Sequence, residues 1–136
     1  MKALLLVSHG SRRQASNDEV RALTRLVATK AGDQFADVRC AFLELAEPSI
    51  PDGIGECVAA GADEVIVLPY FLSAGRHVAE DIPEEIEKKR AELKGVKIRL
   101  VSYVGALAKM TDLLLDAAQC SCDDFRNCDD CPLRTR

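Results

Sequence analysis

The sequence predicts an α/β protein with a single flavodoxin-like domain, in which a four-stranded parallel sheet carries helices on both faces. Short aliphatic runs alternate along the chain with longer stretches of helical periodicity, which is the pattern of βαβ units. The aliphatic runs are apolar almost throughout, as expected of strands covered on both faces. With 136 residues, the chain has the length of one domain.

The individual elements follow from these patterns. Runs rich in Val, Ile and Leu predict strands at about Lys2–Ser8, Asp37–Leu45, Glu64–Tyr70 and Val96–Val101. Apolar residues that recur at three- and four-residue spacing predict helices at about Gln14–Lys30, Pro48–Ala60, His77–Leu93 and Ala106–Ala118. The last helix carries Leu107, Met110, Leu114 and Ala118 on one face. A sheet of four strands leaves edges that invite pairing with another copy, so size alone favours a homodimer.

Charge and hydropathy argue against several classes of protein. The 18 Lys and Arg residues against 22 Asp and Glu give a formal net charge of −4, whereas general nucleic-acid binders are basic. No apolar run approaches the ~20 residues of a membrane span, and the first residues lack the features of a signal peptide. We therefore expect a cytoplasmic protein that binds neither nucleic acid nor membrane.

The two histidines of the chain, His9 and His77, each stand just past a predicted strand. Ligands bind at the carboxyl ends of the strands in open parallel sheets, so the two imidazoles could share one site. Glu44, near the end of the second predicted strand, is expected to point into the same crevice, because burying its charge would be costly. Two neutral imidazoles and a carboxylate suit divalent Co, Ni, Fe or Zn and can also accept protons near neutral pH. The alternatives are a His9 that only satisfies its turn and a Glu44 that is simply exposed.

The loops that carry the histidines also contain cations and apolar side chains. The loop after His9 supplies a helix start and guanidinium donors suited to an anion, through Ser11, Arg12 and Arg13. The loop before His77 combines apolar surface with one cation, through Phe71, Leu72, Ser73 and Arg76. Such a lining suits a flat apolar ligand with peripheral carboxylates. The alternative is a loop that packs Leu72 into the core and leaves His77 to act only at the start of its helix.

Six cysteines fall into two groups. Cys40 and Cys57 lie singly in apolar segments, where a thiol usually acts as a small buried hydrophobe. The other four crowd together as Cys120, Cys122, Cys128 and Cys131. Their spacing can close around one tetrahedral ion such as zinc, or around an iron–sulfur cluster, and the alternative is an acidic tail with idle thiols. We therefore divide the chain into a domain at 1–118 and a cysteine-rich tail at 119–136.

Three parts of the sequence resemble a known family. They are Leu4–Arg12, Phe42–Glu44 with Pro48–Ile50, and Leu68–His77 with Asp81–Pro83. In this order they resemble the short CbiX-type sirohydrochlorin cobaltochelatases, which are class II chelatases. The resemblance implies insertion of Co²⁺ into sirohydrochlorin in anaerobic cobalamin synthesis. It also implies that His9 and His77 bind the metal and accept the pyrrole protons, with Glu44 near the metal.

The same resemblance bears on partners and metals. The short form resembles one half of longer chelatases in which two such units are fused, which implies a homodimer. Related short enzymes insert Ni²⁺ or Fe²⁺ into the same macrocycle, so the metal stays open. Some members carry a carboxyl-terminal iron–sulfur cluster, so the resemblance also allows such a cluster on the tail cysteines of this chain.

Two interpretations from other classes remain. In the first, the protein is a metallochaperone or other non-catalytic metal-binding module. In the second, it is a cofactor-free isomerase or lyase that uses His9 and His77 as acid and base. An apolar crevice with Arg12 and Arg76 around the histidines favours the chelatase, because a metallochaperone needs no such wall.

Overall fold

The central strand of the sheet is β1 (Lys2–Ser8), in which five of seven residues are buried. The computed structural model describes residues 1–128. In it, β1 pairs in parallel with β2 (Asp37–Phe42) on one side and with β3 (Glu64–Pro69) on the other. The fourth strand, β4 (Lys97–Leu100), pairs in parallel with β3. The strand order β2-β1-β3-β4 confirms the predicted parallel flavodoxin-like sheet.

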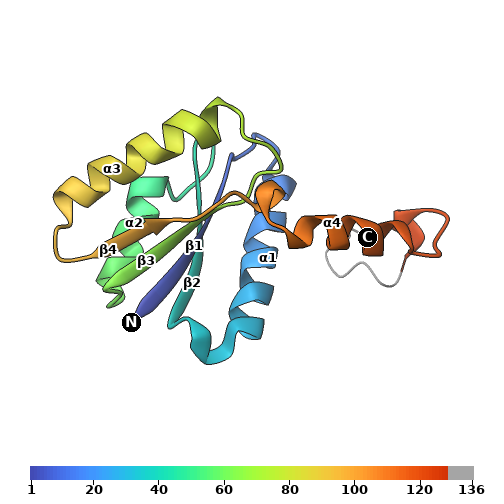
Figure 1. Ribbon diagram of the computed structural model, residues 1–136, viewed down its shortest axis with the longest axis horizontal. Helices are drawn as coiled ribbons and strands as arrows, with labels where there is room; N and C mark the ends of the chain where they lie inside the picture. The colour runs from blue at the N-terminus through green and yellow to red at the C-terminus, as the bar shows by residue number, and fades with distance from the viewer. Residues whose placement is uncertain (129–136) are drawn as a thin grey trace.

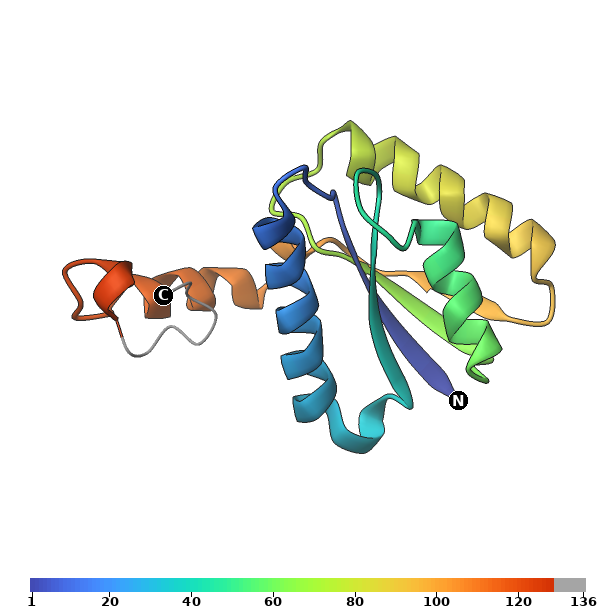
Figure 2. The same ribbon diagram turned by 180° about the vertical axis from the view of Figure 1, so that it is seen from behind.

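Helices lie on both faces of this sheet (Figures 1 and 2). One face is covered by α1 (Gln14–Ala31), and the other by α2 (Ile50–Ala59) and α3 (Ile82–Glu92). A π-helical turn at His77–Asp81 leads directly into α3. The last helix, α4 (Lys109–Ala118), follows a short 3-10 turn at Val104–Ala106.

Alternate residues of β1 serve the two faces of the sheet. Leu5 and Val7 belong to the larger core cluster, together with Ile54 of α2 and Ile86 of α3. Leu4 and Leu6 belong to a smaller cluster against which side chains of α1 pack. This arrangement explains why the strand is apolar throughout, since both of its faces lie under helices.

Cys40 and Cys57 are distributed between these two clusters. Cys57 of α2 is fully buried in the larger cluster, and burial raises the pKa of its thiol to about 11. Cys40 of β2 is half-buried against the smaller cluster. Both positions fit the predicted role of small hydrophobes.

Two boundaries differ from the predicted ones for local reasons. The second strand ends at Phe42 rather than at Leu45, and the chain turns at Leu45, which adopts a positive φ of 66° that a strand does not allow. The second helix begins at Ile50 rather than at Pro48. Ser49 takes the N-cap position, and its hydroxyl accepts a hydrogen bond from the backbone N–H of Asp52.

The predicted apolar stripe of the last helix does not pack on the sheet. Helix α4 extends away from the sheet in both views, and none of its residues belongs to either core cluster (Figures 1 and 2). Leu113, Leu114 and Leu115 are all exposed. Within residues 1–128 no strand follows α4, so the chain does not bring it back to a face of the sheet. Among these residues, no helix combines the length and the apolar character needed to cross a bilayer.

Two glycines of α2 provide a matched test of how this helix packs. A Cβ on Gly53 would lie 2.8 Å from Ala41 Cβ and 3.3 Å from Leu5 Cδ1, whereas a Cβ on Gly55 would meet nothing within 4 Å. Gly55→Ala should stabilise the protein by about 0.5–1 kcal/mol, since alanine favours helix. Gly53→Ala should leave the free energy of unfolding about 1–3 kcal/mol below that of Gly55→Ala, because it overpacks the sheet contact. Urea unfolding measures both, and equal shifts would contradict this packing.

Candidate active site at the carboxyl edge of the sheet

The loops after β1, β2 and β3 meet at one edge of the sheet and bring His9, Glu44 and His77 together. The ring centroids of His9 and His77 lie 4.8 Å apart, with the planes at 63° to one another. Glu44 Oε1 lies 3.3 Å from His9 Nε2. The three side chains are half open to solvent, at 41% for each histidine and 54% for Glu44. A small ion can therefore reach all three groups from outside.

The backbone brings His9 and Glu44 to the same place. Hydrogen bonds between the first two chain segments continue past the strand ends, from Leu43 N to Ser8 O and from Glu44 N to His9 O. Gly10 follows with a φ of 92°, and a Cβ at this position would overlap the carbonyl oxygen of Glu44. Only glycine allows both the conformation and the close approach.

The loop after His9 is also held from α1, by a residue that the sequence analysis missed. Asn17 is 2% exposed, and its Oδ1 accepts a hydrogen bond from Ser11 N at 2.9 Å. Its Nδ2 donates to Ser11 O at 2.7 Å. The available signal was a polar residue three positions before Val20, in line with the apolar stripe of the helix. A buried amide there must find partners, and it finds them in the loop.

Each histidine is fixed through its Nδ1 atom. His9 Nδ1 lies 2.9 Å from the carbonyl oxygen of Gly10, and His77 Nδ1 lies 2.8 Å from Asp81 Oδ2. Both acceptors are oxygens without a proton, so Nδ1 is the donor in each pair, and in the neutral ring Nε2 keeps its lone pair. Histidines that bind metals are oriented in this way by their second nitrogen. Asp81 was not among the predicted site residues, although its four-residue spacing from His77 in a helical segment was visible.

The predicted ligand-binding residues lie around this centre with different exposure. Arg12 and Arg13 are exposed at the start of α1, and the hydroxyl of the half-buried Ser11 accepts from Arg13 N. Ser73 and Arg76 are exposed in the loop after β3, where Arg76 Nε lies 3.6 Å from Glu80 Oε2.

The two apolar residues of the loop after β3 differ. Leu72 is 75% exposed, so the alternative in which it packs into the core is wrong. Phe71 packs partly against the larger core cluster, which leaves Leu72 as the more available apolar surface. Gly105 N donates to Phe71 O, and a Cβ on Gly105 would overlap the backbone of Leu72. The segment after β4 therefore supports this loop from behind.

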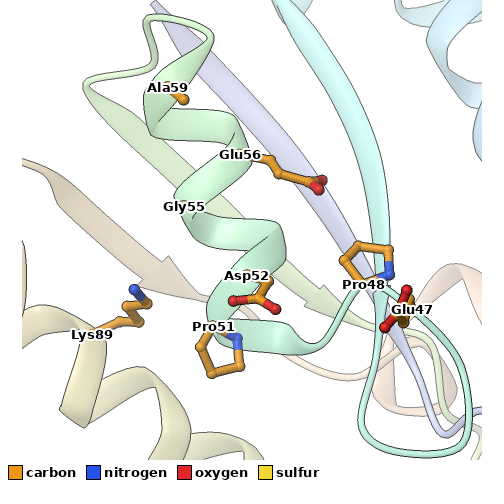
Figure 3. Close-up of a pocket in the computed structure, with 8 residues that line it drawn as sticks. All are labelled: Glu47, Pro48, Pro51, Asp52, Gly55, Glu56, Ala59 and Lys89. Carbon is orange, nitrogen blue, oxygen red and sulfur yellow. The ribbon is translucent and has the colours of Figure 1, made fainter.

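A separate pocket of about 590 Å³ lies along α2 and contains none of the predicted site residues (Figure 3). Its polar side chains are three carboxylates, from Glu47, Asp52 and Glu56, and the amine of Lys89 on α3. It is open and mostly acidic, which does not suit a carboxylate-bearing ligand.

Three of the four tail cysteines come together after α4. The sulfur atoms of Cys120, Cys122 and Cys128 all lie within 4.8 Å of one another. Hydrogen bonds with Cys120 and Cys128 raise the pKa of the Cys122 thiol to about 12. The fourth predicted ligand, Cys131, lies outside the described residues.

The anchoring of His77 can be tested directly. Asp81→Ala removes the acceptor for its Nδ1 proton, so the ring should lose its fixed tautomer and bind a divalent ion about 10–100-fold more weakly. Long-range ¹H–¹⁵N spectra of the neutral rings should show both wild-type histidines protonated on Nδ1. In Asp81→Ala only His77 should change, and His9 serves as the internal control. Protonation of wild-type His77 on Nε2 would show that this account is wrong.

Two proteins of known name are similar in sequence to this chain. The chloroplastic sirohydrochlorin ferrochelatase of Arabidopsis thaliana is 35% identical over 116 residues, which cover 85% of this chain and 51% of that protein. The sirohydrochlorin cobaltochelatase of Sulfurisphaera tokodaii is 30% identical over 119 residues, which cover 88% of this chain and 92% of that protein. The chain thus spans about half the length of the first relative and most of the second.

A solved structure shares the fold. The sirohydrochlorin chelatase SirB from Bacillus subtilis subspecies spizizenii, crystallised in complex with cobalt, superposes with a TM-score of 0.74 at 28% sequence identity. The match covers 86% of this chain and 49% of that one. The sequence model of the CbiX family matches residues 3–120, and the chain therefore belongs to the CbiX family.

Proposed function

We propose that this protein is a sirohydrochlorin chelatase, which inserts a divalent metal ion into the macrocycle, with cobalt as the first candidate. The observation that carries the proposal is the adjacent pair of imidazoles, each held through Nδ1 with the Nε2 lone pair of the neutral ring left available. Membership of the CbiX family supports it, as do relatives named as sirohydrochlorin chelatases.

The metal ion is a substrate in this proposal and binds first to the histidines. Two imidazole nitrogens and the Glu44 carboxylate form a donor set that suits borderline divalent ions such as Co²⁺, Fe²⁺ and Ni²⁺. With few protein ligands and half-exposed side chains, the ion keeps open positions toward solvent. The pyrrole nitrogens of the macrocycle can then displace bound water one at a time.

Insertion requires that two protons leave the ring. Two pyrrole N–H bonds break as the divalent ion forms bonds to the nitrogens, so the exchange of M²⁺ for 2 H⁺ conserves charge. As the ion moves to the ring, each Nε2 lone pair becomes free and can take a proton in its place. Glu44, 3.3 Å from His9 Nε2, provides a further acceptor and a route to solvent. The carboxylate of Asp81 stabilises the imidazolium that forms on His77.

The macrocycle is held by the surrounding loops. Sirohydrochlorin carries acetates and propionates around its edge, and a protein with a net charge of −4 must provide local cations for them. We assign this role to the exposed guanidinium groups of Arg12, Arg13 and Arg76. Leu72 and Ser73 offer the adjoining contact surface, with Phe71 behind them.

The names of the relatives favour two of the three candidate metals. The Sulfurisphaera relative, of which this chain covers 92%, is named a cobaltochelatase and favours Co²⁺. The Arabidopsis relative is more similar in sequence and is named a ferrochelatase, which favours Fe²⁺ as the second candidate. The half-exposed N/O donor set of this edge accepts either ion.

We propose in addition that two chains form a homodimer. The chain spans about half the length of the Arabidopsis and SirB proteins, so two copies would match their size. Strands β2 and β4 are the edges of the sheet, and α4 adds an exposed apolar helix.

The function is tested by following the visible spectrum of sirohydrochlorin during anaerobic incubation with the protein and Co²⁺, Fe²⁺ or Ni²⁺ separately. We expect one of these ions to be inserted at a rate that falls about 10²-fold or more in His9→Ala/His77→Ala, which loses both metal ligands and both proton acceptors. Wild-type protein that inserts no ion faster than this double variant would exclude the chelatase function.

Glu44 has a matched control in the same loop. Glu44→Gln removes the carboxylate beside His9 Nε2 and should lower the insertion rate by about 10²-fold. Glu47→Gln makes the same chemical change three residues further along, at an exposed side chain outside the proposed site, and should leave the rate unchanged. Equal rates for the two variants would remove Glu44 from the mechanism.

A further inference from the structure

We infer that Cys120, Cys122 and Cys128 form a second metal site, which binds a single tetrahedral divalent ion of the zinc type. This site is separate from the histidine pair and does not depend on the proposed chelatase function. The inference rests on the spacing of the sulfur atoms, on the burial of Cys128 and on the position of the segment in the molecule.

The sulfur atoms stand at distances that one ion can bridge. Cys120 Sγ lies 3.2 Å from Cys122 Sγ and 3.4 Å from Cys128 Sγ. Zinc–thiolate bonds of about 2.3 Å in tetrahedral geometry place two sulfur ligands about 3.8 Å apart. A small outward movement of each sulfur would therefore admit an ion. In a cubane iron–sulfur cluster each thiolate binds a different iron atom, so the sulfurs stand further apart than they do on one ion.

One thiol of this segment is buried, although the segment's large apolar side chain is not. Cys128 is 4% exposed, whereas Phe125 in the same turn is 65% exposed. Cys128 belongs to neither core cluster of the protein. Apolar collapse would bury the phenyl ring first, because it carries the larger area. Burial of Cys128 therefore does not follow from apolar packing of Phe125, and it places this thiol inside the cluster with the half-buried Cys122 and the exposed Cys120.

The backbone holds the thiols in place from two sides. Cys120 N donates to Ala117 O at the end of α4, and Cys128 N donates to Phe125 O at the end of a 3-10 turn (Phe125–Asn127). Asp124 caps this turn by accepting from Arg126 N. Its carboxylate also pairs with the Arg126 guanidinium, which fixes the turn further.

The position of the cluster separates it from the histidine site of the same chain. It follows α4, which extends away from the sheet, whereas the histidines lie at the carboxyl edge of the sheet (Figures 1 and 2). The match to the CbiX family ends at residue 120, so Cys122 and Cys128 lie beyond it. An ion bound there is an additional ion, held by soft thiolate ligands in place of imidazole and carboxylate.

Metal binding at the thiols conserves protons and electrons. Three thiols lose their protons to solvent as three metal–sulfur bonds form, and no oxidant or reductant is involved. Water or another ligand fills the fourth position of the tetrahedron.

The experiment uses the full chain, purified without oxygen and titrated with Co²⁺ alone. Thiolate bound to Co²⁺ gives a charge-transfer band in the near ultraviolet, whereas imidazole and carboxylate ligands do not. We expect this band to saturate at one ion per chain, to persist in His9→Ala/His77→Ala and to disappear when Zn²⁺ displaces Co²⁺. It should be absent in Cys120→Ser/Cys122→Ser/Cys128→Ser and intact in Cys40→Ser, the matched control for loss of a thiol outside the cluster.

Three results would overturn the inference. The first is the absence of a thiolate band in wild-type protein. The second is a band of the same strength in the triple serine variant. The third is the assembly of a sulfide-containing iron cluster on the three cysteines by a protein that shows no thiolate band with Co²⁺.

Discussion

The candidate site depends on the continuation of backbone pairing between the first two strand segments beyond the ends of the strands. Hydrogen bonds from Leu43 and Glu44 to Ser8 and His9 carry the parallel ladder into the loops. Gly10 then passes against the carbonyl of Glu44 without space for a side chain. This contact places an imidazole and a carboxylate on the same edge by backbone geometry alone, and β3 delivers His77 to that edge by the same parallel arrangement.

A different hydrogen-bond acceptor orients the ring of each histidine. His9 is held by the carbonyl of its own glycine, and His77 by a carboxylate one turn along the π-helical segment. Both arrangements leave Nε2 as the atom that we propose binds the metal, and the half-exposed side chains leave it accessible from solvent. A site of this kind can exchange a metal ion for protons on the same two nitrogen atoms. The thiol cluster beyond α4 offers soft ligands instead, and we propose that it retains its ion.

The sequence was sufficient for the fold and for the convergence of the histidines, because buried parallel strands leave a strong apolar pattern and each histidine lies in the segment that follows one. The sequence was insufficient for features that depend on the conformation of a loop or on contacts between distant parts of the chain. Leu45 lies outside the strand in a backbone conformation that its apolar side chain does not reveal. Asn17 is a clamp only because the loop after His9 folds back onto α1. The apolar stripe of α4 was visible in the sequence. That this helix does not pack on the sheet depends on the path of the chain after β4, which the stripe does not show.

The central claim is that an ion binds between the two Nε2 atoms at the carboxyl edge of the sheet. Anomalous X-ray diffraction at the cobalt absorption edge, from crystals of the protein grown with Co²⁺, locates the ion without reference to activity. The account predicts a peak about 2.0–2.2 Å from both His9 Nε2 and His77 Nε2, the usual range for imidazole bound to such ions, with both Nδ1 contacts retained. A cobalt ion bound through Nδ1, or cobalt found only at the thiols, would contradict it.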